Sequence, residues 1–195
     1  MPVTLEIARA RPADVPVIAD MSRRLVEVGL PWTWTPARVA RHLHHPESLV
    51  LTARGAGSGQ NALAGFAIAH FGDDIVHLNL LAVDSRWQRR GLGRRLVGWL
   101  EQSAVTAGTF SLCLEVRARN PVALLFYRQL GFVETGRVPR YYSGREDALR
   151  FSKDLRDPVA RFCPDTPPAA GPDAPEGPPA ADWLATRFPR LPRAG

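Results

Sequence analysis

The sequence of 195 residues contains two cysteines, very little lysine and no long apolar run. Cys113 and Cys163 make neither a disulfide framework nor a metal-binding set. No apolar stretch reaches the roughly 20 residues that cross a bilayer. The N-terminus also lacks the charged start and apolar core of a secretion signal. These absences predict a cytoplasmic protein with no membrane contact, no disulfide and no metal.

Basic charge is carried almost entirely by arginine, because Lys153 is the only lysine. Lysine and arginine together number 25 against 19 acidic residues, for a net charge of +6. Arginines and acidic residues are equal in number over residues 156–195, so the excess lies on the preceding part. This charge suits an anionic cofactor or an acidic surface. We do not expect nucleic acid as a partner, because no series of base-stacking aromatic residues accompanies the arginines.

Composition divides the chain near residue 155. Residues 164–179 consist mainly of proline, alanine, glycine and acidic residues without an apolar period. Such a segment cannot bury enough surface to offset its ordering entropy. We therefore predict a folded domain over residues 1–155 and a largely disordered Pro/Ala-rich tail over residues 156–195. A small apolar cluster around Trp183 in this tail either docks on the domain or binds a partner.

Apolar periodicity predicts an α/β fold with a mixed sheet of six to seven strands flanked by four helices. The first helix follows the segment at 11–14 and stops at Gly29, and the second runs from Pro36 to about His44. The third ends near Gly108, and the fourth begins at Pro121. Strands are expected at residues 3–8, 48–54, 62–71, 75–83, 110–117, 133–137 and 148–155.

The most informative stretch joins the strand at 75–83 to the third helix. Gly91 and Gly93 remove the side chains that would hold a ligand away from the backbone. The first N–H groups of the helix have no partners within the helix, so a phosphate can bind there. A dinucleotide fingerprint would need a third glycine, and a P-loop would end in Gly-Lys-Ser/Thr. The glycines are flanked by four arginines: Arg89, Arg90, Arg94 and Arg95.

The segment Gln88-Arg89-Arg90-Gly91-Leu92-Gly93 resembles the Gln/Arg-x-x-Gly-x-Gly/Ala segment of the GNAT N-acetyltransferases, whose backbone amides hold the pyrophosphate of acetyl-CoA. Residues 114–120 (LEVRARN), 125–132 (LFYRQLGF) and 141–148 (YYSGREDA) resemble signatures of the RimI-type members, which modify the N-terminal alanine of a ribosomal protein. Residues 30–32 (LPW) resemble the substrate-side Phe-Pro-Trp of the same group. The resemblance covers residues 1–155 and implies the GNAT fold, in which the two middle strands splay apart.

The resemblance implies acetyl-CoA as co-substrate and no metal. The strand end would bind the pantetheine arm and polarise the thioester carbonyl through its backbone. Asn120 matches a cofactor-binding asparagine, although an asparagine before Pro121 is also a good helix cap. The cofactor-binding residues implied are Leu81, Ala82, Val83, Arg89, Arg90, Gly91, Leu92, Gly93, Arg94 and Asn120.

Acetyl transfer needs a neutral amine, a polarised carbonyl and a proton for the departing thiolate. The resemblance implies Tyr127 as the acid, and packing of the fourth helix is its alternative role. A phenol of pKa about 10 can protonate a thiolate whose conjugate acid has a pKa of about 8.5. The base is either Glu115, acting through water, or His77, and both could instead be structural. Glu115 could pair with Arg117 or Arg119.

The acceptor amine is defined less well than the donor. An α-amine, with a pKa of about 7.7 to 8.0, is partly neutral at pH 7, whereas a lysine at about 10.4 is almost wholly charged. Tyr141, Tyr142, Glu146 and Asp147 resemble a substrate-side loop, where acids could hold a cationic amine. Three functions stay open: a RimI-type acetyltransferase for a protein or peptide N-terminus, an acetyltransferase for a small amine, and a non-catalytic acyl-CoA-binding or interaction module. A homodimer is an open expectation.

Overall fold

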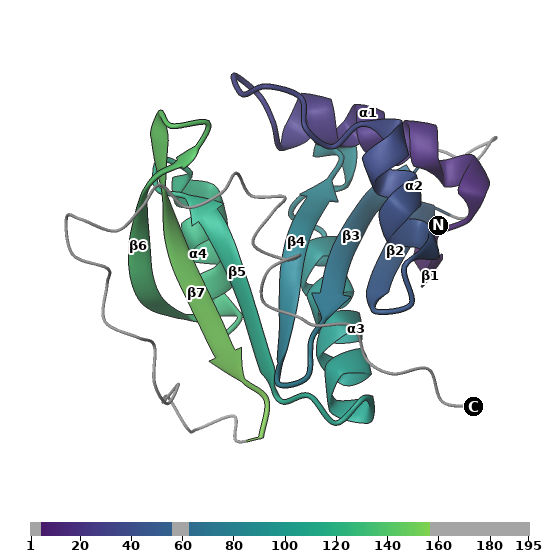
Figure 1. Cartoon of the computed structure of the whole chain (residues 1–195). Helices are drawn as coiled ribbons and strands as arrows, with labels where there is room; N and C mark the ends of the chain where they lie inside the picture. Colours follow the sequence, from purple (N-terminus) through teal and green to yellow (C-terminus); the bar gives the residue numbers. More distant parts are fainter. Residues whose placement is uncertain (1–4, 56–62, 157–195) are drawn as a thin grey trace.

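A seven-stranded sheet with the strand order β1-β2-β3-β4-β5-β7-β6 forms the centre of the molecule (Figure 1). The computed structural model describes residues 5–55 and 63–156. β4 and β5 run parallel, and every other neighbouring pair is antiparallel. The sheet is therefore mixed, as predicted. Its strands are β1 (Leu5–Arg9), β2 (Ser48–Gly55), β3 (Leu63–Phe71), β4 (Ile75–Val83), β5 (Ser111–Arg117), β6 (Val133–Tyr142) and β7 (Glu146–Asp154).

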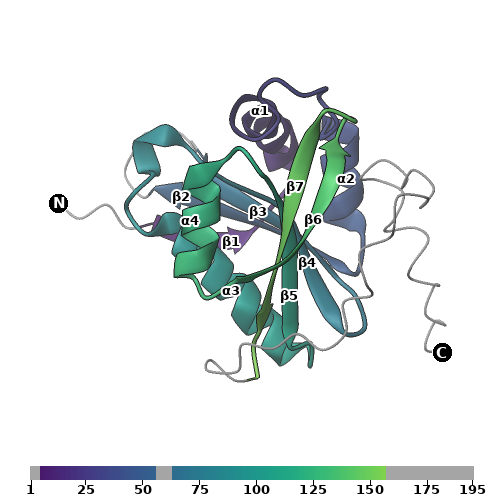
Figure 2. The ribbon, with the colours of Figure 1, turned by 90° about the vertical axis from the view of Figure 1, so that its left-hand side faces the viewer.

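Helices cover both faces of the sheet. Figures 1 and 2 show α1 and α2 on one face and α3 and α4 on the other. Two short 3-10 helices, η1 (Pro12–Asp14) and η2 (Ser85–Trp87), precede α1 and α3. No helix within residues 5–55 and 63–156 is both long and apolar enough to cross a membrane. The bounds are α1 (Val15–Leu25), α2 (Pro36–His44), α3 (Leu92–Thr106) and α4 (Pro121–Gln129).

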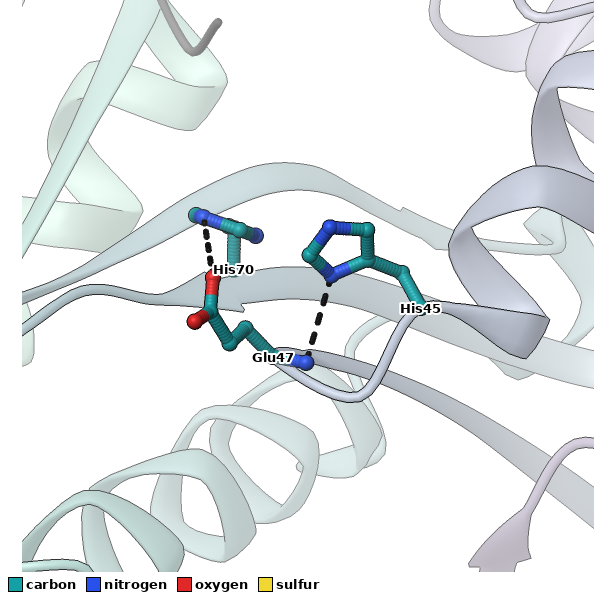
Figure 3. A group of neighbouring side chains, drawn as sticks. All are labelled: His45, Glu47 and His70. Atoms are coloured by element: carbon teal, nitrogen blue, oxygen red, sulfur yellow. Dashed lines mark hydrogen bonds and ion pairs between the residues drawn. The ribbon is translucent and has the colours of Figure 1, made fainter. Parts of the chain in front are cut away.

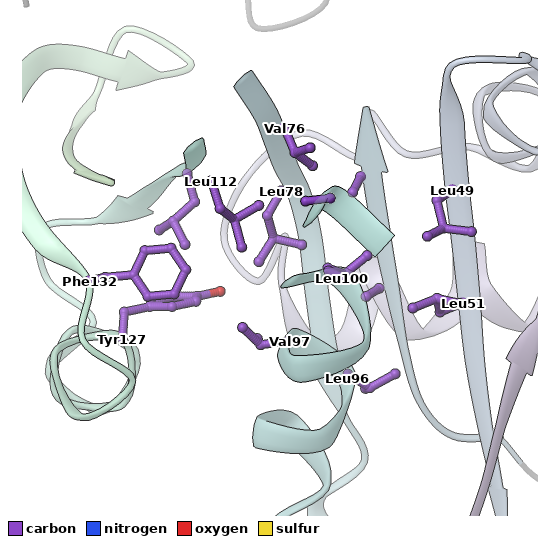
Figure 4. Packing of buried hydrophobic residues seen from close by; sticks show 14 of the residues in the cluster. Leu49, Leu51, Val76, Leu78, Leu96, Val97, Leu100, Leu112, Tyr127 and Phe132 are labelled. Atoms are coloured by element: carbon purple, nitrogen blue, oxygen red, sulfur yellow. The ribbon is translucent and has the colours of Figure 1, made fainter. Parts of the chain in front are cut away.

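Each face of the sheet has its own hydrophobic core. The larger core lies under α3, where Leu92, Leu96 and Leu100 are at most 1% exposed and pack against sheet residues such as Leu51 and Leu78 (Figure 4). The four-residue spacing of these leucines predicted this buried stripe. A second core joins α1 and α2 to the opposite face, with Ile18 and Phe66 fully buried at its centre.

The predicted order of elements is confirmed, and β4 agrees residue for residue. The last two strands are longer than predicted. β6 continues through residues 138–142 (VPRYY), where Pro139 and an irregularity in the β6–β7 ladder interrupt the apolar alternation that would have revealed a strand. Asp147 holds this extension by accepting hydrogen bonds from the backbone N–H of Arg140 and the side chain of Arg137. Predictions for residues 3–4, the turn at 56–62 and the tail from residue 157 lie outside the described residues.

The strands β4 and β5 separate after a short contact. Their register consists of Ile75↔Ser111, Val76↔Leu112 and His77↔Cys113, while β5 pairs with β7 over its whole length. On the other side of β4, the ladder with β3 shifts between Ile68 and Ala69, which leaves Asn79 as an extra residue. The splayed middle strands that the resemblance implied are thus present.

The tight approach of β3 to the end of β4 predicts a stability effect at Gly65. A Cβ at Gly65 would lie 2.8 Å from the backbone oxygen of Ala82, so Gly65→Ala must displace β4. We expect a loss of about 1–3 kcal/mol in the free energy of unfolding, measured by urea denaturation. Gly98→Ala is the matched control, because nothing lies within 4 Å of a Cβ on this helical residue. It should stabilise the protein by up to about 1 kcal/mol, and equal effects of the two substitutions would contradict this account.

Candidate active site

The two base candidates, His77 and Glu115, are directly hydrogen-bonded. His77 on β4 and Glu115 on β5 lie where the strands begin to separate, with 2.6 Å between Nε2 and Oε2. The other oxygen of Glu115 accepts a hydrogen bond of 2.9 Å from Nε of Arg150 on β7. The side chains of His77 and Glu115 are 9% and 4% exposed. The structure therefore joins the two alternatives into one buried unit, which we call the His77–Glu115 pair.

The Glu115 carboxyl is held as an anion. Its burial opposes ionisation, but hydrogen bonding and charge from His77, together with those from Arg150, outweigh burial and lower the pKa of Glu115 below its ordinary value. The alternative that Glu115 pairs with Arg117 or Arg119 is wrong: its guanidinium partner is Arg150 of β7, and Arg117 pairs with Glu146. A carboxylate of lowered pKa is a poor proton acceptor by itself but orients and stabilises a protonated imidazole.

Asn79 completes the surroundings of His77. Its Oδ1 lies 2.6 Å from His77 Nδ1, so with this amide orientation both ring nitrogens face oxygen atoms. A half-turn of the Asn79 amide would let Nδ2 donate to Nδ1 and leave the imidazole neutral. Nδ2 of Asn79 is buried and has no hydrogen-bond partner among the described residues. The amide of Asn79 can therefore present either an acceptor or a donor to Nδ1 of His77.

Tyr127 of α4 lies in the core on the other side of the sheet. Its ring packs edge-on against Phe126 and Phe132, with centroid distances of 5.1 and 5.5 Å. Figure 4 shows its hydroxyl pointing away from α4, toward the side where Leu78 and Val97 lie. Burial raises the pKa of Tyr127, so the phenol stays protonated at neutral pH. Packing of the helix is confirmed as one role, and a protonated phenol is also what the predicted acid requires.

Tyr142, at the end of β6, contacts the backbone of Glu115. Its hydroxyl donates to the backbone oxygen of Glu115 over 3.3 Å. Burial is the main cause that raises its pKa, and Tyr141, Glu115 and Tyr127 add to the effect. The sequence analysis named Tyr142 only as part of a segment that resembles a substrate-side loop. It did not predict the contact with Glu115. The structure adds it to the site.

The loop before α3 has the backbone geometry of an anion site. Gly91 has φ +78° as the N-cap, and the first helical hydrogen bond runs from Arg95 N to Gly91 O. The N–H groups of residues 92–94 precede that bond and are available to a ligand. Leu92 is 1% exposed, so it can bind only through its backbone. A Cβ on Gly93 would lie 3.1 Å from the Phe126 ring, so this glycine also lets α3 approach the helix that carries Tyr127.

Two side chains of this loop bind to neighbouring strands, and the others are exposed. Gln88 donates to the backbone oxygen of Val83 and ties the loop to the end of β4. Arg95 donates to the backbone oxygen of Leu5 and so turns toward β1. The other three arginines, Arg89, Arg90 and Arg94, are exposed at the loop. Leu81, Ala82 and Val83 form the end of β4 beyond its pairing with β5.

The helix-cap role of Asn120 is confirmed. Its side chain accepts a hydrogen bond of 3.1 Å from the backbone N–H of Ala123 at the start of α4. This cap helps to place Tyr127, which lies two turns further along the helix. Its contact with the cofactor stays a prediction.

A single arginine connects the α1–α2 loop to the β6–β7 hairpin. Arg117, at the end of β5, donates to the backbone oxygen of Val28 in the α1–α2 loop and pairs with Glu146 of β7. Glu27 folds the α1–α2 loop by accepting hydrogen bonds from Ser22, Thr33 and Trp34. This organising glutamate has no motif around it and was not identified from the sequence. An open pocket of about 680 Å³ lies at this loop, lined by Arg23, Arg24, Leu25, Glu27, Val28, Gly29, Leu30 and Trp32.

Comparison with known proteins identifies the class to which this fold and site belong. Residues 19–132 match the family described as the acetyltransferase (GNAT) family. The chain belongs to this family.

Two relatives and one solved structure show which members of this family the chain is similar to. The [ribosomal protein bS18]-alanine N-acetyltransferase of Salmonella typhimurium is 41% identical over 95 residues, which cover 47% of this chain and 64% of that protein. The N-alpha-acetyltransferase RimI of Mycobacterium tuberculosis is 34% identical over 152 residues, 75% of this chain and 90% of that protein. The crystal structure of the Escherichia coli ribosomal-protein-S18-alanine N-acetyltransferase has a TM-score of 0.66 and 30% identity, and covers 78% of this chain and 94% of that one.

The lowered pKa of Glu115 predicts how stability depends on pH. A group whose pKa is lower in the folded state contributes stability above its unfolded pKa of about 4.3 and loses it as pH falls through the folded value. Glu115→Gln should therefore cost about 3 kcal/mol near pH 7, because His77 and Arg150 lose a buried anion. The difference from wild type should shrink as pH falls from about 5 toward 3.

Urea denaturation of both proteins across this pH range measures the difference. Glu134→Gln is the control, since its pair with Arg128 is exposed and worth less than about 1 kcal/mol. A difference between wild type and Glu115→Gln that is the same at pH 3 and pH 7 would show that the pair does not ionise as described.

Proposed function

We propose that the protein is an acetyl-CoA-dependent N-acetyltransferase that acts on the α-amine of a protein or peptide N-terminus. The observation that carries this proposal is the placement of Tyr127 and the His77–Glu115 pair on opposite faces of the sheet, at the gap between β4 and β5. The named activities of the Salmonella and Mycobacterium relatives support the acceptor class. The gap lets an amine approach from one face while the sulfur leaves on the other.

Acetyl-CoA fits the loop and strand that border this gap. The amides of Leu92, Gly93 and Arg94 would receive the pyrophosphate at the start of α3, with Arg89 and Arg90 beside it. The positive φ of Gly91 and the closeness of Gly93 to Phe126 supply the tight turn that such an approach requires. The end of β4, residues 81–83, would hold the pantetheine arm on the side where it no longer pairs with β5.

The chain's own groups supply both proton transfers. The His77–Glu115 pair accepts, through a water molecule, the proton that the attacking amine must lose. That proton enters at a carboxylate oxygen of Glu115, because both ring nitrogens of His77 already face Glu115 and Asn79. Tyr127 donates its proton to the thiolate sulfur as the C–S bond breaks and the C–N bond forms. The amine thus exchanges one N–H bond for the new C–N bond, and the sulfur ends as a thiol. Return of a proton from the His77–Glu115 pair to Tyr127 through solvent restores the starting state.

The lining of the open pocket favours a peptide over a small amine. A site for a polyamine or another cationic metabolite would need free carboxylates in an enclosed cavity. Here Arg23 and Arg24 line an open surface, and the carboxylate of Glu27 is occupied by loop hydrogen bonds. The exposed Trp32 offers an apolar contact to a side chain next to the amine. A cytoplasmic location accords with ribosomal-protein acetylation, and a homodimer stays a prediction.

The acceptor is tested with two matched peptides. One carries a free N-terminal alanine and no lysine, and the other has the same residues with a blocked N-terminus and one added lysine. We expect mass spectrometry to find one acetyl group on the first peptide and none on the second after incubation with acetyl-CoA. Acetylation of the blocked peptide alone, or turnover only with polyamines or aminoglycosides, would contradict the proposed acceptor.

The role of Tyr127 is tested by Tyr127→Phe, which keeps the ring that packs on Phe126 and Phe132. We expect kcat to fall by about 10²-fold or more, because the proton for the thiolate is lost. The melting temperature and the Kd for acetyl-CoA should change little. Retention of full activity by this variant would leave Tyr127 with the packing role alone.

A further inference from the structure

Three metal-ligating side chains meet at one end of the sheet, on the α2 side. His45 and Glu47 lie in the connection between α2 and β2, and His70 lies near the end of β3 (Figure 3). One donor atom from each residue lies within 4.8 Å of the others. Nε2 of His70 is 3.7 Å from Oε2 of Glu47, and the rings of His45 and His70 are 5.3 Å apart. We call these residues the His45–Glu47–His70 cluster.

The fold fixes the backbone of this cluster from both sides. Ser48 pairs with His70 in the β2–β3 ladder, and Phe71 N donates to the backbone oxygen of Glu47 over 2.7 Å. Ser48 N donates to the backbone oxygen of His45 over 3.0 Å. The side chain of His70 is buried, whereas that of His45 is exposed, and its Nδ1 accepts a hydrogen bond of 3.2 Å from the backbone N–H of Glu47 (Figure 3). The cluster therefore has one rigid ligand and two adjustable ones.

A polar neighbour orients the buried ligand. The hydroxyl of Ser48 lies 3.5 Å from Nδ1 of His70 and 3.1 Å from Nδ1 of His42. If the hydroxyl donates to His42, it can accept from Nδ1–H of a neutral His70. This tautomer directs the lone pair of Nε2 toward Glu47. Metal-binding histidines commonly have such a hydrogen bond on their second nitrogen.

We propose that His45, Glu47 and His70 bind a divalent transition-metal ion, of which Zn²⁺ has the best-matched chemistry. Two imidazole nitrogens and one carboxylate oxygen are a known zinc ligand set, and three protein ligands leave a fourth position for water. Nitrogen donors disfavour Ca²⁺ and Mg²⁺, which take oxygen ligands. Metal–ligand bonds of about 2.0–2.2 Å require donors somewhat closer together than 4.8 Å. A rotation of the exposed His45 ring, which releases its hydrogen bond from the backbone N–H of Glu47, would bring them closer.

None of the three ligands belongs to the groups assigned to acetyl transfer, although His70 is the direct partner of His77 in the β3–β4 ladder. A bound ion would join the α2–β2 connection to β3 and so stabilise the folded protein. At saturating Zn²⁺ we expect the thermal midpoint to rise by about 5 °C.

The test uses the untagged full chain with Cys163→Ser, so that this cysteine cannot supply a ligand. Isothermal titration with Zn²⁺ measures affinity, and the visible absorption of Co²⁺ reports tetrahedral coordination. His45→Ala should weaken binding at least about tenfold and abolish the tetrahedral Co²⁺ spectrum. Glu47→Gln should also weaken binding, since it removes the anionic ligand while keeping the side-chain shape.

His44→Ala is the matched control. His44 is the adjacent histidine, also exposed, and its Nδ1 bonds to the backbone oxygen of Ala40 outside the cluster. This variant should bind Zn²⁺ within about twofold of the parent and keep the midpoint shift. Equal binding by His45→Ala and the parent, or an equal loss in His44→Ala and His45→Ala, would overturn the proposal.

Discussion

The short parallel contact between β4 and β5 is the constraint on which the rest of the structure depends. After His77↔Cys113 the two strands diverge, and β7 takes the full length of the other edge of β5. Backbone groups on the facing edges beyond this point lose the partners that a continuous ladder would provide. A protein can keep such an opening in its central sheet only if other groups, or a ligand, satisfy those edges. The opening therefore lowers the stability of the sheet, but it leaves backbone groups of β4 available to hydrogen-bond an extended molecule that lies along this strand.

The buried charges beside this opening are stable as a set. Glu115 is hydrogen-bonded to His77 and Arg150, and His77 in turn to Asn79, so the carboxylate and both ring nitrogens have partners within the site. Removal of one member would leave another charged and buried without compensation. The same reasoning applies to Glu27, whose carboxylate holds the α1–α2 loop through backbone and side-chain donors. Each of these two buried carboxylates thus holds several neighbouring groups in place through the hydrogen bonds that it accepts.

Much of the fold could be predicted because its signals are local. Leu92, Leu96 and Leu100 reveal α3 by their spacing, and Thr35 accepts from Arg38 N to cap α2, whose Pro36 marked the start. The glycine-containing loop before α3 could be predicted for the same reason, since its two glycines and the start of the helix are adjacent in the sequence. The candidate catalytic residues Tyr127, Glu115 and His77 could be predicted only from the resemblance, which gave them as separate residues.

Contacts between distant residues could not be predicted in this way. The His77–Glu115 contact depends on the β4–β5 register, and Arg150 reaches Glu115 because β7 inserts beside β5. The His45–Glu47–His70 cluster likewise exists only through the β2–β3 register, so the sequence analysis, which expected no metal, had no spacing motif to find. In each case the information lies in strand pairing, and no single segment contains it.

The position of Arg117 has a consequence for how a large acceptor can enter. One guanidinium contacts the α1–α2 loop through Val28 and the β6–β7 hairpin through Glu146, so neither loop can swing outward alone without breaking a bond that also restrains the other. The two loops are therefore restrained together by this one guanidinium. For the proposed acceptor, this joint restraint favours a chain terminus that enters between the two loops in an extended form.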